Sequence, residues 1–182
     1  MHFKSILGIF YSASRALASL AALMATALLL SAPVSAQGIE RLGDFGDWSA
    51  FKFFEDGNPA CYMASQPIKD EGDYTRRGDI YALVTHRPAE SRRDEVSFVA
   101  GYDFKSDSTV EVTIGSLKKQ LFTQGDSAWA ADKETDGELV KAMIRGSRMI
   151  VKGTSSRGTG TVDTYSLSGF TKAHRAIGDA CQ

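Results

Sequence analysis

The sequence predicts a mainly β fold, an antiparallel β-sandwich or open barrel of about eight or nine strands with two short helices near the C-terminus. Two observations carry this prediction. Short β-favouring runs recur between turn signals about every 8–12 residues. These runs do not alternate regularly with helices, so a doubly wound parallel sheet is disfavoured. No internal repeat or interdomain linker interrupts the pattern, and we expect a single β-rich exported domain over residues 37–182.

The predicted strands share runs of β-branched or aromatic residues bounded by Gly, Pro, Asn or Asp. They cover residues 47–54, 60–64, 79–85, 95–102, 109–114, 119–123, 148–152 and 161–167, with a short apolar stretch around Trp129. The first two runs flank a turn rich in Gly, Asn and Pro, which predicts a hairpin. Residues 109–114 alternate strictly between apolar and polar positions, as expected of a strand with one wet face.

Two segments have helical rather than strand periodicity. Residues 138–145 place apolar side chains on one face, with Asp136 as the expected N-cap and Gly146 as the expected left-handed residue after the helix. Residues 171–177 form a second amphipathic helix, which we expect Gly178 to stop. The polar stretches between elements, residues 66–78, 87–94 and 153–160, are the candidate recognition loops.

Residues 1–36 have the organisation of a cleavable secretory signal. Basic residues precede an apolar stretch over residues 16–30, and Val34 and Ala36 are the small residues typical of a signal-peptidase site. The apolar stretch is shorter than the roughly 20 residues that a membrane-spanning helix needs, so a retained anchor is the weaker interpretation. We expect a mature chain without a transmembrane segment, located in the periplasm, or secreted or associated with the outer membrane.

The charge balance argues against general nucleic-acid binding. The chain carries 21 Lys and Arg against 22 Asp and Glu, and the leader would remove two of the bases, Lys4 and Arg15. Nucleic-acid binding needs a basic surface that displaces counterions, and the basic residues here occur as pairs rather than as a run. We therefore expect a protein or a cell-envelope component as the partner, and no nucleic acid.

The chain has two cysteines, Cys61 and Cys181. An even number of cysteines in an exported protein favours a disulfide, and the alternative is a pair of buried free thiols. A bridge would tie the final segment to an early strand. For a loop of this length, chain-entropy models give a stabilisation of about 4–5 kcal/mol.

Four segments together carry a family resemblance: Gly46-Asp-Trp48, the strand of Cys61, and the runs at residues 139–146 and 165–170. They resemble the invasion-associated locus B family of exported α-proteobacterial proteins. The resemblance implies a β-rich periplasmic or surface domain, a role in host-cell invasion, and no established catalytic residue. Family members often carry a cysteine soon after the Trp and a further pair mid-chain, which this chain lacks. We therefore identify it as a divergent member whose disulfide is not copied from the family.

Only His86 and His174 remain beyond the leader as candidate bases or metal ligands. Nucleophilic catalysis needs a base beside a nucleophile, and a compact metal motif needs ligands at short spacing. Neither histidine has a ligand at i+2 or i+4. We interpret both as separate surface or strand-edge residues, and we expect no catalytic residue, no metal and no cofactor.

The tripeptide Arg77-Gly78-Asp79 is a candidate recognition motif. On an exposed loop it would present a cation and a carboxylate to a receptor. The alternative is the plain start of a strand, and a three-residue match often arises by chance.

These observations favour a non-enzymatic exported protein that binds a protein or envelope partner, with a role in host interaction or virulence. The alternatives are a periplasmic inhibitor or chaperone-like module and a hydrolase of an unrecognised type. An enzyme would need a pocket that joins a histidine to a hydroxyl or carboxylate. A binding module would expose an apolar or aromatic patch.

We predict that N-terminal sequencing of the protein isolated from the envelope will find Gln37 as its first residue. The reason is that signal peptidase cleaves after a small residue, here Ala36. An Ala36→Arg variant should accumulate as the precursor. An intact leader in the wild-type protein would instead indicate a membrane anchor.

Overall fold

The computed structural model describes residues 38–182, and within this range the chain forms a mainly antiparallel β structure with two α-helices. The predicted leader and its cleavage site lie outside the described residues. No helix within residues 38–182 has the length and apolar character needed to cross a membrane.

Eleven strands make up the sheet. They are β1 (Glu40–Phe45), β2 (Trp48–Glu55), β3 (Asn58–Ser65), β4 (Lys69–Gly72), β5 (Tyr81–Arg87), β6 (Arg92–Val99), β7 (Thr109–Ile114), β8 (Leu117–Gln124), β9 (Ser127–Trp129), β10 (Arg148–Thr154) and β11 (Gly160–Ser166). The helices are α2 (Lys133–Arg145) and α3 (Phe170–Ala180), and a short 3-10 helix, η2, spans Pro88–Glu90.

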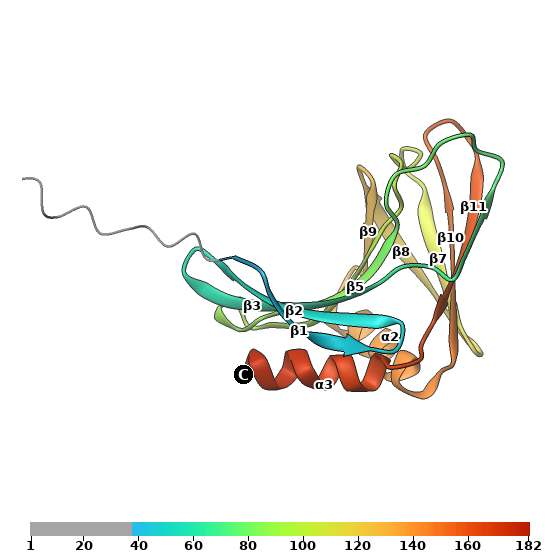
Figure 1. Ribbon diagram of the computed structural model, residues 1–182. Coiled ribbons are helices and arrows are strands. Elements are labelled where there is room, and N and C mark those ends of the chain that lie inside the picture. The colour runs from blue at the N-terminus through green and yellow to red at the C-terminus, as the bar shows by residue number, and fades with distance from the viewer. Residues whose placement is uncertain (1–37) are drawn as a thin grey trace, which may run out of the picture. The chain divides into compact units, whose positions relative to one another are not determined.

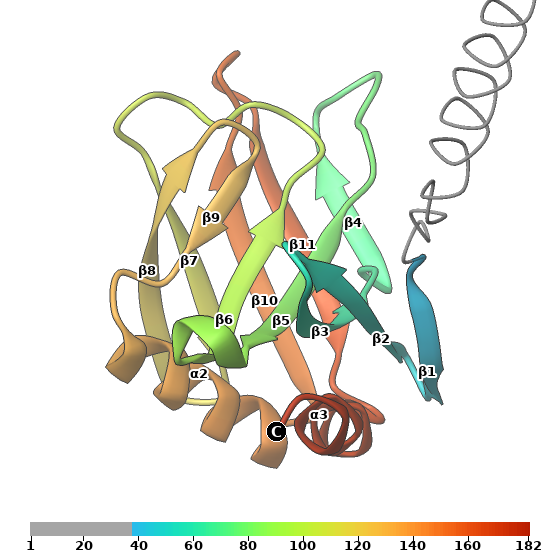
Figure 2. The same cartoon turned by 90° about the vertical axis from the view of Figure 1, so that its left-hand side faces the viewer.

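All the strands belong to one sheet, whose spatial order is β1-β2-β3-β5-β6-β9-β8-β7-β10-β11-β4. Every pairing in it is antiparallel. The sheet curves so that β7, β10 and β11 stand behind β5 and β6 (Figure 2). The end strands β1 and β4 do not pair with each other, so the sheet is open. The predicted mainly β, antiparallel class is confirmed, and the open form is the one present.

The structure has more strands than the sequence predicts, because three short ones have no clear alternation. β4 lies within the predicted loop 66–78, and all four of its residues are exposed. It pairs with β11 as an edge strand, and polar residues are typical of such edges. β1 has a register shift between Arg41 and Gly43, which interrupts any period-two pattern. β9 has only three residues.

Both helices are longer than predicted. α2 begins at Lys133, and its N-cap is Asp132, whose carboxylate accepts a hydrogen bond from the backbone N–H of Thr135 at 2.8 Å. The assignment of Asp136 as the N-cap is wrong, since this residue is buried inside the helix. Gly146 has φ −84°, so it is not the left-handed residue expected there. α3 continues through Gly178 to Ala180, because a helix tolerates one glycine at modest cost.

The two helices cover the inner face of the open sheet. α3 lies beneath β1, β2 and β3 (Figure 1), where it buries Phe170, Ala173 and Ile177. The ring of Phe170 meets Trp48 of β2 edge-to-face, with centroids 4.9 Å apart. α2 packs on β6, β7 and β8 through Leu139, Val140 and Met143. All these residues belong to a single apolar core, so the helices and the sheet fold as one unit.

The turn before β2 crosses the start of α3 at very short range. The backbone N–H of Asp47 donates to the carbonyl of Ser168 at 3.1 Å. Gly169, the N-cap of α3, has φ +88°, and a Cβ atom built on it would lie 1.6 Å from the carbonyl oxygen of Phe45. Only glycine fits this crossing without a backbone shift.

We predict that Gly169→Ala lowers the free energy of unfolding by about 3 kcal/mol, because it adds both a positive-φ penalty and a clash with backbone. The matched control is Gly178→Ala in the same helix, where an added Cβ meets nothing within 4 Å. That variant should be as stable as the wild type or up to about 1 kcal/mol more stable. Urea unfolding followed by circular dichroism measures both, and equal stability of the two variants would contradict the prediction.

Candidate functional site

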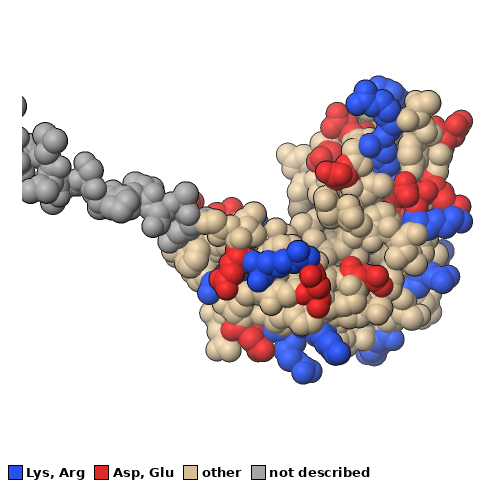
Figure 3. Space-filling view, viewed as in Figure 1, with Lys and Arg blue, Asp and Glu red and all other residues tan. Residues whose placement is uncertain are grey.

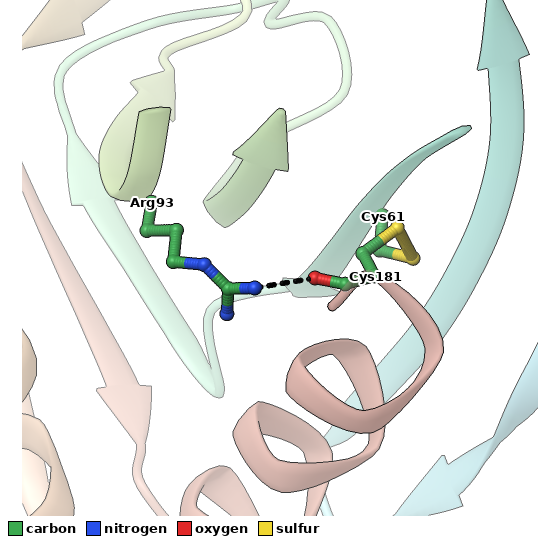
Figure 4. Close-up of a disulfide and its surroundings, with 3 residues drawn as sticks. All are labelled: Cys61, Arg93 and Cys181. Carbon is green, nitrogen blue, oxygen red and sulfur yellow. Dashed lines mark hydrogen bonds between the residues drawn. A yellow bond between two sulfur atoms is a disulfide. The ribbon is translucent and has the colours of Figure 1, made fainter. Parts of the chain in front are cut away.

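The expected disulfide is present and holds the C-terminal end of α3 to the sheet. Cys61 of β3 and Cys181 are bonded, with Cα atoms 6.0 Å apart and a sequence separation of 120 residues. The carbonyl of Cys181 also accepts a hydrogen bond of 2.9 Å from the guanidinium of Arg93 (Figure 4). The helix end is therefore held at two adjacent points, one covalent and one polar.

The structure places the Arg77 side chain inside the protein, which favours the plain start of a strand over a receptor motif. Its guanidinium binds Asp163 of β11 through two hydrogen bonds of 2.6 Å, and the side chains are only 3% and 6% exposed. A third hydrogen bond of 2.7 Å runs from Nε to the carbonyl of Ala100. The guanidinium also lies over the ring of Tyr102. Arg77 thus ties the segment before β5 to β11 and does not offer a free cation to a receptor.

The rest of the tripeptide leads into the strand. The backbone N–H of Gly78 donates to the carbonyl of Gly101 at 2.8 Å, and the two glycines approach so closely that a Cβ on Gly101 would lie 2.5 Å from the Gly78 oxygen. Asp79 is exposed and precedes β5. Burial of the Asp163 carboxyl raises its pKa, and the hydrogen bonds from Arg77 partly offset that rise. This arrangement is a structural ion pair at the start of a strand.

The two histidines are not separate, which corrects the prediction from their spacing. His86 of β5 and His174 of α3 have ring centroids 5.5 Å apart. Asp94 of β6 lies between them, with its Oδ1 2.6 Å from Nε2 of His174 and 3.7 Å from Nε2 of His86. We call His86, Asp94 and His174 the histidine cluster. The spacing in sequence gives no sign of it, because the three residues come from different elements.

The members of the histidine cluster differ in burial and protonation. The side chain of His86 is 3% exposed, and burial lowers its pKa to about 4, so its ring is neutral at pH 7. The hydrogen bond with His174 holds the pKa of Asp94 below its usual value. A neutral imidazole and a carboxylate therefore face each other at physiological pH.

The histidine cluster has one feature expected of an enzyme, a histidine beside a carboxylate. Among the described residues, neither histidine has a hydrogen bond with a Ser, Thr or Tyr hydroxyl. The carboxylate of Asp94 is within reach of His174, and the three residues do not line the four best-defined grooves within residues 38–182.

The structure does expose an aromatic surface. Phe122 of β8 and Trp129 of β9 are cross-strand partners whose rings stack with centroids 5.8 Å apart, and Phe122 is 46% exposed. They line a groove of about 510 Å³ between these strands, the start of β6 and the first turn of α2. We call it the aromatic groove. Its other lining residues include Arg93, Val96, Lys133 and Asp136.

One of the residues that line the aromatic groove, Asp136, has a carboxyl group with a raised pKa. Its carboxylate accepts a hydrogen bond of 2.8 Å from the backbone N–H of Val96, which joins α2 to β6. Burial raises the pKa of Asp136 to about 6. Its role differs from the predicted cap, because an acidic residue near a helix start has the same local signature in both positions.

Two of the candidate recognition loops meet at a second groove. Residues 73–78 and 155–157 line a space of about 720 Å³ together with Tyr102 and Thr161, and its exposed lining is mainly polar. Acidic and basic side chains are interspersed on the face shown in Figure 3, without a large area of one sign. The aromatic groove is therefore the better candidate for partner binding, because buried aromatic residues contribute most of the energy at protein interfaces.

A family model and a solved structure match this chain. The model described as invasion associated locus B (IalB) protein matches residues 48–178. The crystal structure of invasion associated protein B from Bartonella henselae is similar with a TM-score of 0.54 and 15% sequence identity, covering 76% of this chain and 95% of that one. At this identity the likeness shows the fold alone. No curated protein matches the chain.

We predict that Arg77→Ala lowers the free energy of unfolding by about 3–5 kcal/mol, because it leaves the Asp163 carboxylate buried without a partner. The double variant Arg77→Met/Asp163→Leu should regain most of this loss. Arg76→Ala, at the exposed neighbouring position, is the control and should change stability by less than about 0.5 kcal/mol. Urea denaturation of the four proteins checks this, and an Arg77→Ala variant as stable as the control would show that the buried pair has no structural role.

Proposed function

Because the chain belongs to the invasion associated locus B family, we propose that it is a non-enzymatic domain of the bacterial envelope that binds a protein partner through the aromatic groove. The observation that carries this proposal is the stacked pair Phe122 and Trp129 at the edge of a groove of about 510 Å³. The partner segment brings an apolar or aromatic side chain into that groove.

The dimensions of the aromatic groove suit such a segment. Its volume lies within the range of about 300–1,000 Å³ that is typical of ligand sites in proteins. Trp and Tyr side chains and Arg are the residues most often found at binding hot spots, and this groove has Trp129 at one wall and Arg93 near another. The charged rim gives polar contacts around an apolar centre, as in known interfaces.

The rigid walls of the aromatic groove also favour a binding role. Its walls come from strands and from the first turn of α2, which the core and the N-cap at Asp132 hold in place. Rigid walls lower the entropy cost of binding, because few side chains must be ordered when the partner arrives. The groove offers a hydrophobic contact, and one of its three acidic lining residues, Asp136, accepts a hydrogen bond from the backbone N–H of Val96.

Location in the envelope follows from chemistry as well as from the family. A disulfide is consistent with an oxidising compartment such as the periplasm. The family name carries an association with invasion, and we extend the proposal to host contact, with the partner belonging to the bacterial envelope or to the host surface. The experiment below separates these two sources.

We predict that a benzophenone photocrosslinker placed at Phe122 in intact cells forms one discrete adduct with a partner protein. The matched control is the same crosslinker at Phe54, an equally aromatic and exposed position on β2 outside the groove. That position should form no such adduct. Mass spectrometry identifies the partner, and repeating the irradiation during contact with host cells shows whether it is an envelope or a host protein.

A second arm tests the contribution of Trp129 with the crosslinker at a different position in the groove. With the crosslinker at Gln124, which also lines the groove, Trp129→Ala should reduce the adduct by at least about 10-fold, the effect of a hot-spot residue. Thermal unfolding verifies that the variant is folded. Adducts of equal yield at Phe122 and Phe54 would overturn the proposal. Many weak adducts would instead support a chaperone-like module.

A further inference from the structure

We propose that His86, Asp94 and His174 form a binding site for a divalent transition metal, with Zn²⁺ as the best-fitting ion. The ligand atoms of the three side chains all lie within 4.8 Å of one another. Two imidazole nitrogens and one carboxylate oxygen make a common set of protein ligands for zinc, which leaves a fourth position for water or another ligand.

The first observation in favour of this site is a buried polar group without a partner. Neither ring nitrogen of His86 has a hydrogen bond, although its side chain is 3% exposed. Leaving such a group unsatisfied costs about 1–3 kcal/mol. A metal ion bound at Nε2 would satisfy one of the two nitrogens, the one that faces the carboxylate of Asp94 at 3.7 Å.

A second observation is the backbone distortion around two of the ligands. The pairing of β5 with β6 shifts register between Thr85 and Arg87, so that His86 has no partner in β6 although it pairs with Cys61 of β3. Asp94, in the facing part of β6, has φ +62°, an unfavourable conformation for a residue with a side chain. Bulges of this type re-aim side chains and are common beside functional sites. Here the distortion brings His86 and Asp94 together.

The third ligand is held in place by its own helix. The ring of Phe170, one turn earlier in α3, stacks on His174 with an angle of 11° between the planes. Cys61, the cross-strand partner of His86, is joined to Cys181 at the end of the same helix. The disulfide and the core thus fix α3 relative to β5, and the site needs little reorganisation.

The three ligand side chains must move slightly when a metal ion binds. Tetrahedral zinc with bonds of about 2.0–2.2 Å sets its ligand atoms roughly 3.3 Å apart. The hydrogen bond of 2.6 Å between Asp94 and His174 must therefore open, while His86 and Asp94 move slightly closer. Asp94 and His174 have side chains that are 34% and 23% exposed, so the ion can enter from solvent and keep a water ligand.

The charged side chains around the site determine its affinity for a metal ion. Asp94 supplies the one carboxylate, and Arg93 is the cation close enough to disfavour protonation of His86. The guanidinium of Arg93 is held at the carbonyl of Cys181, and its charge opposes a bound cation. We therefore expect weaker binding than that of a structural site with four cysteine or histidine ligands.

The test uses the purified, disulfide-intact chain after removal of metals with a chelator. Calorimetric titration with ZnCl₂ should show one ion per chain, and ZnCl₂ but not MgCl₂ should raise the unfolding temperature. Addition of Co²⁺ should give the intense visible absorption of a four-coordinate site. His174→Gln and Asp94→Asn should each weaken zinc binding by at least about 10-fold. Both change partly exposed residues, so they remain informative where a substitution of buried His86 prevents folding.

Asp179→Asn is the matched control, since it removes an exposed carboxylate from the same helix at a position outside the cluster. It should bind zinc as the wild type does. Three results would each overturn the proposal: no heat of binding, a Co²⁺ spectrum typical of six-coordinate aqueous ion, or equal affinity in the wild type, His174→Gln and Asp94→Asn.

Discussion

The packing of α3 beneath β1, β2 and β3 is the interaction on which the rest of this structure depends. The curved sheet covers part of its own inner face, where Phe98 of β6 meets Tyr165 of β11, but the apolar side of β1, β2 and β3 needs a second layer, which α3 provides. Phe170 meets Trp48 there, and the indole N–H of Trp48 donates to the carbonyl of Ser166 at 3.0 Å, just before the helix. The same contact therefore joins the early strands to the end of the chain and closes the core on one side.

The docking of α3 also explains why the disulfide, the Arg93 contact and the histidine cluster occur together. All three lie where the middle and the C-terminal end of the helix meet β3, β5 and β6. The covalent bond limits how far the helix can separate from the sheet. Polar side chains can then be buried at this junction, since their neighbours stay in position. A rigid helix–sheet junction is a good place for a metal site, because ligands from distant parts of the chain keep their separation.

The aromatic groove has a different origin. It forms in the middle of the sheet order, where the short strand β9 leaves space between β8, β6 and the first turn of α2. Because β9 has only three residues, Phe122 and Trp129 are left without a further strand or helix to cover them. The binding surface that we propose thus follows from a short strand. Arg93 lines this groove and also lies close enough to His86 to disfavour its protonation, so the groove and the histidine cluster are neighbours around the start of β6.

The sequence by itself determined the local features of this protein: the β-rich pattern, most of the strands, the amphipathic faces of both helices and the family. Alternation and helical spacing depend on near neighbours, so they are visible without a structure. Only the tertiary structure decided which distant residues meet. Arg77 pairs with Asp163, and His86, Asp94 and His174 converge. β1 and β4 become strands because they find partners in β2 and β11 rather than through their own composition. Pairing between segments far apart in the chain depends on the fold of the whole sheet, and no local pattern encodes it.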